Sequence, residues 1–565
     1  MQKYGELLRN LLKKRGIIDE AQALIFLNPD YERDFHDPFL MKDMEKACVR
    51  LYEAIENKEK IIIYADYDCD GIPGAVILSD LFKKINFTNY EIYIPQRNSE
   101  GYGLNLETLK QFAESEIKLL ITVDLGITAV AEVAQAKVDG IDVIITDHHI
   151  PLKVLPRAYA ILNPKVDAYP EKMLSGAGVV FKFVQAFIKK YGKENKHFKI
   201  KDGWEKWMLD MAGLATLSDM VPLTGENRAI AYFGMKVLKK SPRPGFQKLL
   251  AKMNIDQKYI NEDDIGFMVT PRLNAASRMD DPMRAYELLS TLDALEASGL
   301  VNHLSKINDE RKTIVTGIMR EVNKKLETYE HKEVMVIGNP KWRVGILGLV
   351  AGKISDEYKK PVFVWGKDEN DCIKGSCRSD GSVSVVELMT KTQESFIDFG
   401  GHELAGGFTV HSEKIHFLEE ALSFSFIKIK KSGERSFLEE ERNDGKREIL
   451  KSDYVLNLSG VNMKNWHEIE KMSPFGFGNP KPIFLFEKVK IEKIKKFGKN
   501  GSGEHLEITF SDANKTKVKA ISFFSSVDSF KNTLSEGLDV NLFATFDLSR
   551  FRGKEELRLR IEDII

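Results

Sequence analysis

Three aspartates at alternating positions follow a short apolar run in the first quarter of the chain. The run Ile61–Ile63 leads into Asp66, Asp68 and Asp70, and Gly71 comes next. Alternate side chains of an extended segment share one face, so the three carboxylates can converge on one cation or on two. Gly71 stands where a strand must turn into the next helix, which a residue without a Cβ allows.

Two simpler interpretations of this triplet stay open. An acidic surface turn has the same composition, and Asp-x-Asp-x-Asp-Gly also begins like a calcium-binding loop. An EF-hand loop needs a Glu six residues after its Gly, whereas this chain has Ile77 there. The calcium loop is therefore the weaker alternative.

More acids and two histidines follow other apolar runs. Asp124 comes directly after one run, and Asp147-His148-His149 comes after the next. Asp219 follows a helical stretch, where an Asp by itself is more typical of a helix cap. Carboxylate with imidazole suits manganese, iron or zinc, and carboxylate with water suits magnesium. The set is rich enough in ligands for two metal ions, with one histidine as a ligand and the other as a neighbour or substrate contact.

The apolar runs themselves explain how these residues meet. Short runs alternate with amphipathic stretches, which is the βαβ rhythm of a parallel sheet covered by helices. Apart from Asp219, these acids and histidines follow strands, and the carboxyl edge of such a sheet is where ligands bind. We expect strands at 60–65, 90–95, 118–123, 141–146 and 159–162, and helices around 72–85, 104–116 and 127–138.

Basic residues recur near glycine-rich or small-residue segments. Arg97 lies beside the turn at Gly101–Gly103, and the guanidinium fork matches two phosphate oxygens. Asn274 and Arg278 lie in a short polar segment between helical stretches, where a backbone can approach closely. An exposed loop arginine is the plain alternative for Arg97. Residues 284–328 show helical periodicity and predict helices that bridge two lobes.

The second half of the chain predicts two further domains. A strand begins after Lys332, and Ser376, Arg378 and a glycine pair before His402 complete a small α/β lobe. Residues 428–452 are charged and predict a solvated linker. The last 90 or so residues alternate short strands with turns, which fits an OB-type barrel. The expected strands are 483–486, 488–494, 506–509, 517–523, 540–547 and 557–561.

One basic run in this barrel suggests a single-strand groove. Lys488 and Lys490 share a strand face, as do Lys493 and Lys495, and the two pairs share one face only if a bulge intervenes. Phe497 follows, and cations with aromatics suit phosphates and bases. A solubilising edge strand is the alternative.

Composition sets broad limits. A chain of 565 residues is too long for a single hydrophobic core, so several domains are expected. The 83 basic and 84 acidic residues give a net charge of -1, so a charged partner must bind to a local patch. Four cysteines without CxxC pairing argue for a reducing compartment. Neither a leader nor a span of about 18 apolar residues is evident, so we expect a cytoplasmic protein that does not enter a membrane.

The motifs around Asp66–Gly71, Asp124, Asp147–His149 and Ser218–Leu223 resemble, in order and spacing, the four metal motifs of the DHH phosphoesterase superfamily. More narrowly, the chain is similar to the RecJ family of single-strand-specific DNA exonucleases over residues 35 to 565. Two positions depart from the family pattern. Pro73 stands where a small hydroxyl residue is usual, and Arg343 stands where His is usual, so we assign Arg343 no catalytic role.

The resemblance implies a fold class and a domain order. The fold is α/β: a parallel-sheet DHH domain, long helices, a smaller α/β DHHA1 domain and an OB-type barrel. The expected limits are 1–45 for an N-terminal helical extension, 46–283 for DHH, 284–330 for connecting helices, 331–427 for DHHA1, 428–452 for the linker and 453–565 for the barrel.

The resemblance also implies an activity: 5'→3' hydrolysis of single-stranded DNA to nucleoside 5'-monophosphates with two Mn²⁺ or Mg²⁺ ions, in DNA repair and recombination. Asp124 would bridge the ions and His149 would contact the scissile phosphate. The implied metal ligands are Asp66, Asp68, Asp70, Asp124, His148 and Asp219. The implied DNA contacts are Arg97, Asn274, Arg278, Ser376, Arg378, His402, Lys493, Lys495 and Phe497.

Partners implied by the resemblance are a strand with a 5' end, a single-stranded-DNA-binding protein and a RecQ-type helicase. Two rival functions remain. A DHH phosphodiesterase of short oligonucleotides or cyclic dinucleotides shares the metal motifs but normally lacks the barrel. A non-catalytic single-strand-binding relative should have lost metal ligands, which this chain keeps.

Overall fold

The structure is a computed structural model that describes residues 1–565 except 98, 193–197, 328–331, 433–451, 499–504, 531 and 551–554. The described chain divides into two compact units. The larger unit comprises Pro38–Asp219 and Val237–Gly445, and the smaller unit comprises Met1–Asp37, Met220–Lys236 and Lys446–Ile565. Within the described residues, no helix has both the length and the apolar character needed to cross a membrane.

A five-stranded parallel sheet forms the first lobe of the larger unit, in the order β2-β1-β3-β4-β5. Its strands are β1 (Ile61–Ala65), β2 (Tyr90–Tyr93), β3 (Leu119–Val123), β4 (Asp142–Thr146) and β5 (Ala160–Leu162). The all-parallel pairing confirms the predicted sheet. The central strands β1 and β3 are buried along their whole length, as expected of a sheet covered on both faces.

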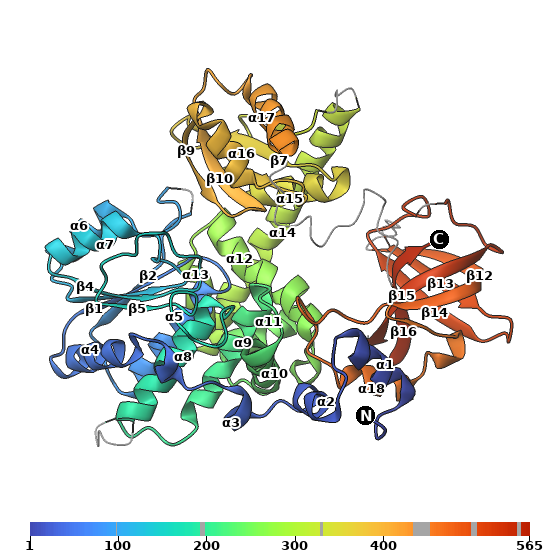
Figure 1. The fold of residues 1–565 in the computed structure, drawn as a ribbon, viewed down its shortest axis with the longest axis horizontal. Helices are drawn as coiled ribbons and strands as arrows, with labels where there is room; N and C mark the ends of the chain where they lie inside the picture. The colour runs from blue at the N-terminus through green and yellow to red at the C-terminus, as the bar shows by residue number, and fades with distance from the viewer. Residues whose placement is uncertain are drawn as a thin grey trace. The chain divides into compact units, whose positions relative to one another are not determined.

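Helices cover both faces of this sheet (Figure 1). On one face, α6 (Leu106–Glu114) and α7 (Val130–Val138) pack their apolar residues against Ile62, Tyr64 and Leu120. On the other face, α5 (Gly71–Lys84) lies beside α8 (Gly176–Tyr191). The remaining helices of this lobe are α4 (Met44–Glu56), α9 (Leu209–Ser218), α11 (Pro244–Lys252), α12 (Thr270–Met279) and α13 (Met283–Ser290).

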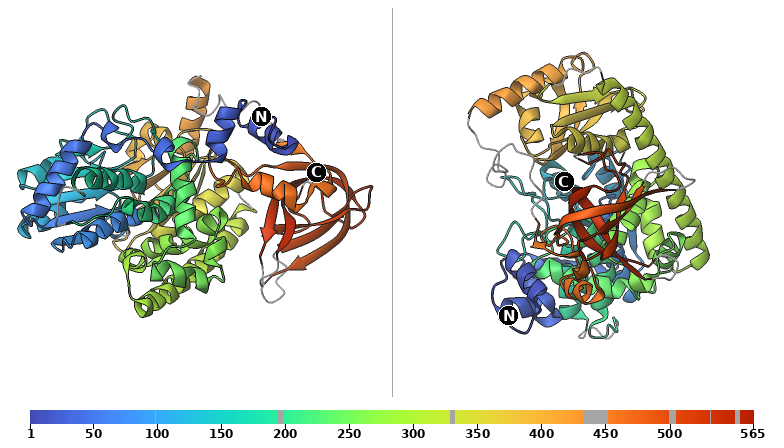
Figure 2. Two further views of the ribbon diagram at one scale, coloured as in Figure 1. Left: turned by 90° about the horizontal axis from the view of Figure 1, so that it is seen from below. Right: turned by 90° about the vertical axis from the view of Figure 1, so that its right-hand side faces the viewer.

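A 33-residue helix, α14 (Ala294–Leu326), joins the two lobes of the larger unit (Figure 2). Its first half packs against α11 and α12. Its second half contributes Val315, Ile318 and Val322 to a core that also contains Val350 of α15 (Leu347–Tyr358). Because one rigid element supplies both cores, the predicted connecting helices also couple the two lobes.

The second lobe has a mixed sheet in the order β6-β7-β8-β10-β9. Its elements are β6 (Met335–Gly338), β7 (Val362–Lys367), β8 (Ile373–Arg378), α16 (Val385–Lys391), β9 (Phe396–Gly401), β10 (Ala405–Val410) and α17 (Leu418–Ser432). The start of the segment predicted as a linker is helical, because α17 continues through Ser432. Residues 433–451 of that predicted linker lie outside the described residues.

The smaller unit contains a six-stranded barrel-like sheet in the order β11-β12-β13-β14-β16-β15, with β12 also pairing with β15. Its strands are β11 (Tyr454–Val455), β12 (Phe484–Phe497), β13 (His505–Ser511), β14 (Lys517–Phe523), β15 (Asp539–Ser549) and β16 (Glu556–Ile564). The two strands predicted at 483–486 and 488–494 form the single strand β12. The prediction was wrong there because bulges, rather than a turn, separate the two apolar segments.

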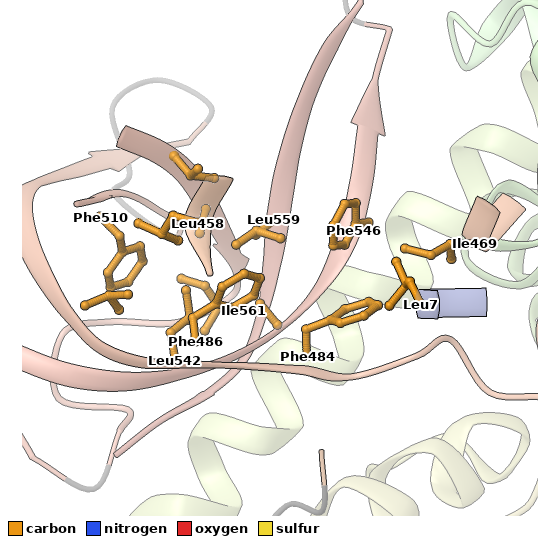
Figure 3. Close-up of a cluster of buried hydrophobic side chains, with 14 of the residues drawn as sticks. Leu7, Leu458, Ile469, Phe484, Phe486, Phe510, Leu542, Phe546, Leu559 and Ile561 are labelled. Carbon is orange, nitrogen blue, oxygen red and sulfur yellow. The ribbon is translucent and has the colours of Figure 1, made fainter. Parts of the chain in front are cut away.

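N-terminal helices complete the core of the smaller unit (Figure 3). Leu7 of α1 (Glu6–Lys14) and Ile469 of α18 (Met463–Glu470) belong to one buried cluster with Phe484 and Phe546 of the barrel. The short helices α2 (Glu20–Leu27) and α3 (Tyr31–Asp34) follow α1, and α10 (Gly225–Leu238) crosses the division between the units. The N-terminal residues therefore stabilise the barrel.

Candidate active site

The carboxyl ends of β1, β3 and β4 place both histidines and all the predicted acids except Asp219, which follows the end of α9. The backbone N–H groups of Asp66, Asp124 and Asp147 each donate to the last residues of the neighbouring strand, at N···O distances of 3.0, 2.9 and 3.0 Å. These bonds hold the ends of β1, β3, β4 and β5 in line. Side chains from three separate strand–helix connections consequently face one another across the sheet edge.

Seven of the side chains come together in overlapping groups. Within each of three triads, the potential ligand atoms all lie within 4.8 Å of one another. The triads are Asp66/Asp68/Asp124, Asp70/His148/Asp219 and Asp124/His148/His149. Asp124 and His148 each belong to two triads, so the groups form one continuous cluster at the end of the sheet.

The amino end of α8 fixes Asp70. The N–H groups of Gly176 and Ala177 donate to the two oxygens of the Asp70 carboxylate at 2.6 and 2.8 Å. A helix amino end favours a negative charge at this place. A Cβ on Gly176 would lie 2.5 Å from the Asp124 Cβ. A side chain at Gly176 would therefore displace Asp124, which explains the glycine at the start of this helix.

Asp124 adopts a strained backbone conformation. Its φ of +62° lies in the left-handed region that non-glycine residues rarely occupy. The side chain is buried, and its Oδ1 atom has no hydrogen-bond partner in the described chain. Such strain persists only where the surroundings impose it, and it is concentrated at functional sites. The conformation aims the Asp124 carboxylate at the centre of the cluster.

Burial and mutual repulsion make this cluster costly without a cation. Burial, followed by the neighbouring carboxylates, raises the pKa of Asp66 and Asp124 well above the ordinary value. The same causes raise the pKa of Asp70 to about 7 and that of Asp219 to about 8. A site in which so many carboxylates are buried together favours positive charge.

The two histidines differ in environment. Burial lowers the pKa of His148 to about 3, so its ring is neutral at neutral pH. Its Nε2 lies 3.2 Å from Asp124 Oδ1 and 3.7 Å from both Asp70 Oδ2 and Asp219 Oδ2. The ring also hydrogen-bonds the backbone of Leu174. With Nε2 facing the acids and the backbone holding the ring, His148 is oriented as metal-binding imidazoles usually are.

His149 is held by Asp147 instead. Its Nδ1 lies 2.7 Å from Asp147 Oδ1. Burial alone would lower the pKa of His149, but the bond to Asp147 and the nearby carboxylates outweigh it, and the pKa is raised. A protonated His149 is therefore favoured, and its ring stacks on that of His402 with centroids 5.7 Å apart and planes inclined by 7°.

The donor set fits hard divalent cations. Oxygen atoms predominate, one neutral imidazole nitrogen joins them, and the buried oxygens Asp66 Oδ1 and Asp124 Oδ1 have no hydrogen-bond partner among the described residues. Carboxylates with one or two imidazoles suit Mn²⁺, and carboxylates with water suit Mg²⁺. Asp124 and His148 each belong to two triads, but the Asp124 carboxylate has two oxygens whereas His148 offers one ring nitrogen, so Asp124 is the residue best placed to serve two ions.

Arginines gather beside the acidic cluster. The Arg97 guanidinium lies 4.9 Å from the centre of the Tyr67 ring, next to Asp66 and Asp68. Burial lowers the pKa of Arg278 to about 9, and the charges of Arg97 and Arg378 contribute to that shift. No described carboxylate ion-pairs with these three arginines. Partly buried cations without a carboxylate partner favour an anionic ligand such as phosphate.

The second lobe contributes to the same arginine group. A Cβ on Gly348, in the first turn of α15, would lie 3.1 Å from an Arg378 nitrogen and 3.6 Å from Ser376 Oγ. Arg278 Nη1 donates to the Gly345 carbonyl at 3.2 Å. Arg378 and Ser376 thus lie close to the amino end of α15, and donors of this kind together suit an anion.

Other predicted residues lie elsewhere. The segment that contains Asn274 and Arg278 is itself the helix α12, not an irregular motif between helices. Pro271 lies in the first turn of this helix, where proline is tolerated. Asn274 Oδ1 is buried without a described partner. Lys493, Lys495 and Phe497 belong to the smaller unit.

The two departures from the family pattern are benign in structural terms. Pro73 lies in the first turn of α5, where its missing N–H interrupts no helical bond. Arg343 is exposed before the short helix that leads into α15. Neither residue belongs to the acidic cluster.

Several residues of the site carried no sequence prediction. The Tyr102 hydroxyl donates to the Asp124 carbonyl at 3.3 Å and lies 3.4 Å from His149 Nδ1. Asn163 and Lys165 contact the backbone of the tandem histidines. The run Ser175-Gly-Ala-Gly178 before an apolar helix was a detectable signal, because glycines at a helix start allow close approach to an anion.

Three family descriptions match the chain: "DHH family, N-terminal domain" over residues 60–216, "DHHA1 domain" over 331–425 and "RecJ OB domain" over 452–563. The single-stranded-DNA-specific exonuclease RecJ of Bacillus subtilis is 32% identical over 565 residues, covering 99% of this chain and 67% of that protein. This chain belongs to the RecJ family. RecJ of Haemophilus influenzae is 29% identical, over 94% of this chain and 91% of its own.

Solved RecJ structures have the same fold. RecJ of Thermus thermophilus in complex with Mn²⁺ has a TM-score of 0.80 and 24% identity, covering 100% of this chain and 76% of its own. A RecJ exonuclease bound to manganese has a TM-score of 0.61 and 28% identity, covering 70% of this chain and 97% of its own. The RecJ fold class predicted from the sequence is confirmed.

Proposed function

We propose that this RecJ-family protein is a metal-dependent exonuclease that degrades single-stranded DNA from the 5' end and releases nucleoside 5'-monophosphates. The observation that supports this most directly is that two clusters of opposite charge lie next to each other in the larger unit. An acidic cluster that favours divalent cations lies beside an arginine cluster that favours phosphate. A terminal phosphate held by the arginines would place the first phosphodiester bond at the acids.

Each group in the site has a role in this proposal. Asp66, Asp68, Asp70, Asp124, His148 and Asp219 hold two divalent ions, Mn²⁺ or Mg²⁺. Bound there, such ions activate water and stabilise the charge that develops on both the attacking and the leaving oxygen. The bond to Asp147 and the nearby carboxylates raise the pKa of His149, which favours the protonated ring, and a protonated ring can donate to a phosphate oxygen. His402 stacks on His149 and restrains its ring.

Arg97, Arg278, Ser376 and Arg378 account for the selection of an end. A terminal phosphate monoester carries more charge than an internal diester, and it presents three oxygens to a cluster of guanidinium groups. Asn274 lies on the helix that carries Arg278 and can contact the strand there. An internal diester would satisfy fewer of these donors, so ends are favoured over internal bonds.

The decisive assay uses single- and double-stranded DNA labelled at either end, with Mn²⁺ or EDTA. We expect labelled 5'-monophosphate to appear first from the 5' label and only from the single strand in Mn²⁺. Products longer than mononucleotides, release from the 3' label first, or equal rates on dinucleotides and long strands would contradict the proposal. The last result would favour the small-substrate DHH phosphodiesterase.

Replacing Arg378 tests the end site. Arg378→Met keeps much of the side chain's length but removes two phosphate donors and a charge. We expect a loss of about 10- to 100-fold in kcat/KM on 5'-phosphorylated strands, because the charge-assisted contact of the guanidinium group as a whole contributes about 1.5–3 kcal/mol. On 5'-hydroxyl strands the loss should be small. Exposed Arg343, which lies outside the arginine cluster, supplies the control Arg343→Met.

The outer face of the barrel supports single-strand binding. A bulge between Ile491 and Lys493 shifts the register of β12. Lys490, Lys493 and Lys495 then pair with Ser511, Thr509 and Glu507, which alternate along β13 and so lie on one face. The bulge that the sequence interpretation required is present. Three lysines in line provide cations at a spacing suited to a phosphate backbone.

An aromatic row continues this face. Phe497 pairs with His505 and His505 pairs with Phe523, with ring centroids 5.2 and 5.4 Å apart. Phe523 is 40% exposed and Phe524 is 83% exposed. Aromatic rings exposed next to cations are typical of surfaces on which bases stack.

Phe523→Ala tests this surface. We expect the Kd for a long single strand to rise about 5- to 50-fold, since base–aromatic stacking contributes about 1–3 kcal/mol per base. The kcat at saturating DNA should stay within about twofold, because Phe523 belongs to the unit without the acidic cluster. Exposed Phe417 of the other unit provides the matched variant Phe417→Ala. An unchanged Kd would mean that these aromatic side chains do not bind DNA and instead serve solubility or contact another partner.

Partner proteins follow from family membership alone. We propose a single-stranded-DNA-binding protein and a RecQ-type helicase as partners that supply the single strand, in DNA repair and recombination. Co-purification of each with this chain, in the presence of nuclease to remove bridging DNA, tests this association.

A further inference from the structure

The turn after β5 contacts the backbone of the adjacent histidines His148 and His149. Asn163 is fully buried, and its Nδ2 donates to the His149 carbonyl at 3.0 Å. Lys165 Nζ donates to the His148 carbonyl. The Lys165 N–H also donates to Asn163 Oδ1 at 2.9 Å, which orders the turn itself.

Side chains therefore hold all four backbone polar groups of the two histidines. Asp147 Oδ1 accepts from the N–H groups of His148 and His149 at 2.7 and 3.0 Å. Asn163 and Lys165 donate to the two carbonyls. Since both peptide planes are fixed, the Cα–Cβ directions of both histidines are fixed as well. The hydrogen bonds of a strand or helix do not fix these peptide groups, because the histidines follow the end of β4.

Lysine is an unusual donor for a hydrogen bond to a backbone carbonyl beside so many carboxylates. The charge of Lys165 acts on Asp147, Asp219 and Asp124, yet no described carboxylate lies within ion-pair distance of it. An ammonium beside so many acids would ordinarily pair with one of them. The bond to the neutral His148 carbonyl leaves the carboxylates without a lysine partner, so they can bind a cation. It also places the ammonium charge next to the His148 backbone.

We propose that Lys165 and Asn163 are positioning residues that hold the His148–His149 backbone so that His148 Nε2 faces the acids and His149 faces the substrate. This assignment rests on the proposed function for its kinetic consequences. Its structural consequence, a correctly aimed His148, is independent of the reaction. Lys165 touches neither substrate nor metal in this scheme.

Lys165→Met tests the proposal, because methionine is of similar length and lacks the donor and the charge. We expect kcat on saturating single-stranded DNA to fall about 10- to 50-fold with KM changed less than about twofold, since a small misplacement of catalytic groups costs one to two orders of magnitude. Lys165→Arg retains a donor and should recover most of the rate.

Lys172 is the matched control. Its Nζ also donates to backbone carbonyls of this turn, those of Pro164 and Asp167, but to neither histidine. Lys172→Met should stay within about twofold of the unmodified protein. If both lysine variants lose activity equally, the turn is merely structural and the proposal is wrong.

Mn²⁺ affinity, measured by calorimetry without DNA, gives a readout independent of cleavage. We expect Lys165→Met to bind Mn²⁺ about 5- to 50-fold more weakly, with Lys165→Arg close to the unmodified protein, in line with losses seen when the partners of metal ligands are removed. Unchanged Mn²⁺ affinity would overturn the proposal, even if the unmodified protein proved to have another substrate.

A substrate contact by Lys165 would look different. The KM would rise, kcat would be retained, and the salt dependence of DNA binding would fall by about one phosphate contact. That outcome would replace the positioning role with a phosphate-binding role. Thermal unfolding checks folding, and Lys165→Gln serves if the methionine variant does not fold.

Discussion

Asp124→Asn should reduce cleavage of single-stranded DNA by about 10³-fold or more while the Kd for the strand changes less than about threefold. Asp124 is shared by two triads of potential ligands, and Asn offers one neutral oxygen where the carboxylate offers two charged ones. Asn also tolerates the left-handed backbone at this position, where φ is +62°. The change thus alters the chemistry and keeps the fold.

Stability should move in the opposite direction from activity. Burial raises the pKa of Asp124, which means that its charged form is unfavourable in the folded protein without metal. Asp124→Asn should therefore leave the Tm of the metal-free protein unchanged or raise it. Single-turnover assays and thermal unfolding measure the two effects. A large fall in Tm would indicate a structural role, and Asp139→Asn, at the end of α7, is the control.

Removal of divalent metal should abolish cleavage, and Mn²⁺ or Mg²⁺ should restore it. Metal should also raise the Tm, because it relieves the repulsion among carboxylates of the acidic cluster. This stabilisation should depend on pH. The pKa values of Asp70 and Asp219 are raised to about 7 and about 8, above those of the unfolded chain.

The sign of the pH dependence follows from those shifts. The folded metal-free protein binds protons more tightly than the unfolded chain, so its stability falls as pH rises from about 4 to about 8. Above about pH 8 the stability that these protonated carboxyl groups contribute is fully lost. The Tm shift on adding Mn²⁺ should therefore be larger at about pH 8.5 than at about pH 6, and Asp124→Asn should reduce this difference. Equal shifts at both pH values, or cleavage in EDTA, would contradict the metal assignment.

Local patterns in the sequence determined the sheet and the acids at its edge. Buried runs such as Ile61–Ala65 and Leu119–Val123 are apolar nearly throughout, which is the mark of a parallel strand covered on both faces. Once the strands are parallel, their carboxyl ends meet at one edge. The convergence of Asp66, Asp124 and His148 thus follows from sequence periodicity and topology alone.

The barrel shows where that reasoning fails. The segments around Phe484 and Ile491 were predicted as two strands, yet they form one strand with bulges. A bulge depends on the pairing partners of the strand, which lie far away in sequence. The segment at Thr270–Met279 was predicted as a short polar motif between helical stretches, yet it forms the helix α12. Packing of α12 against α14, which lies further along the chain, stabilises this helix.

Only the tertiary structure decided the electrostatics and the support of the site. The sequence pattern that placed Asp66, Asp68 and Asp70 on one face does not show that amides of Gly176 and Ala177, far along the chain, hold Asp70. Nor does it show that Asn163 and Lys165 fasten the histidines. Periodicity determines which face a side chain occupies. Its pKa, its orientation and its neighbours depend on what burial brings against it from elsewhere in the chain.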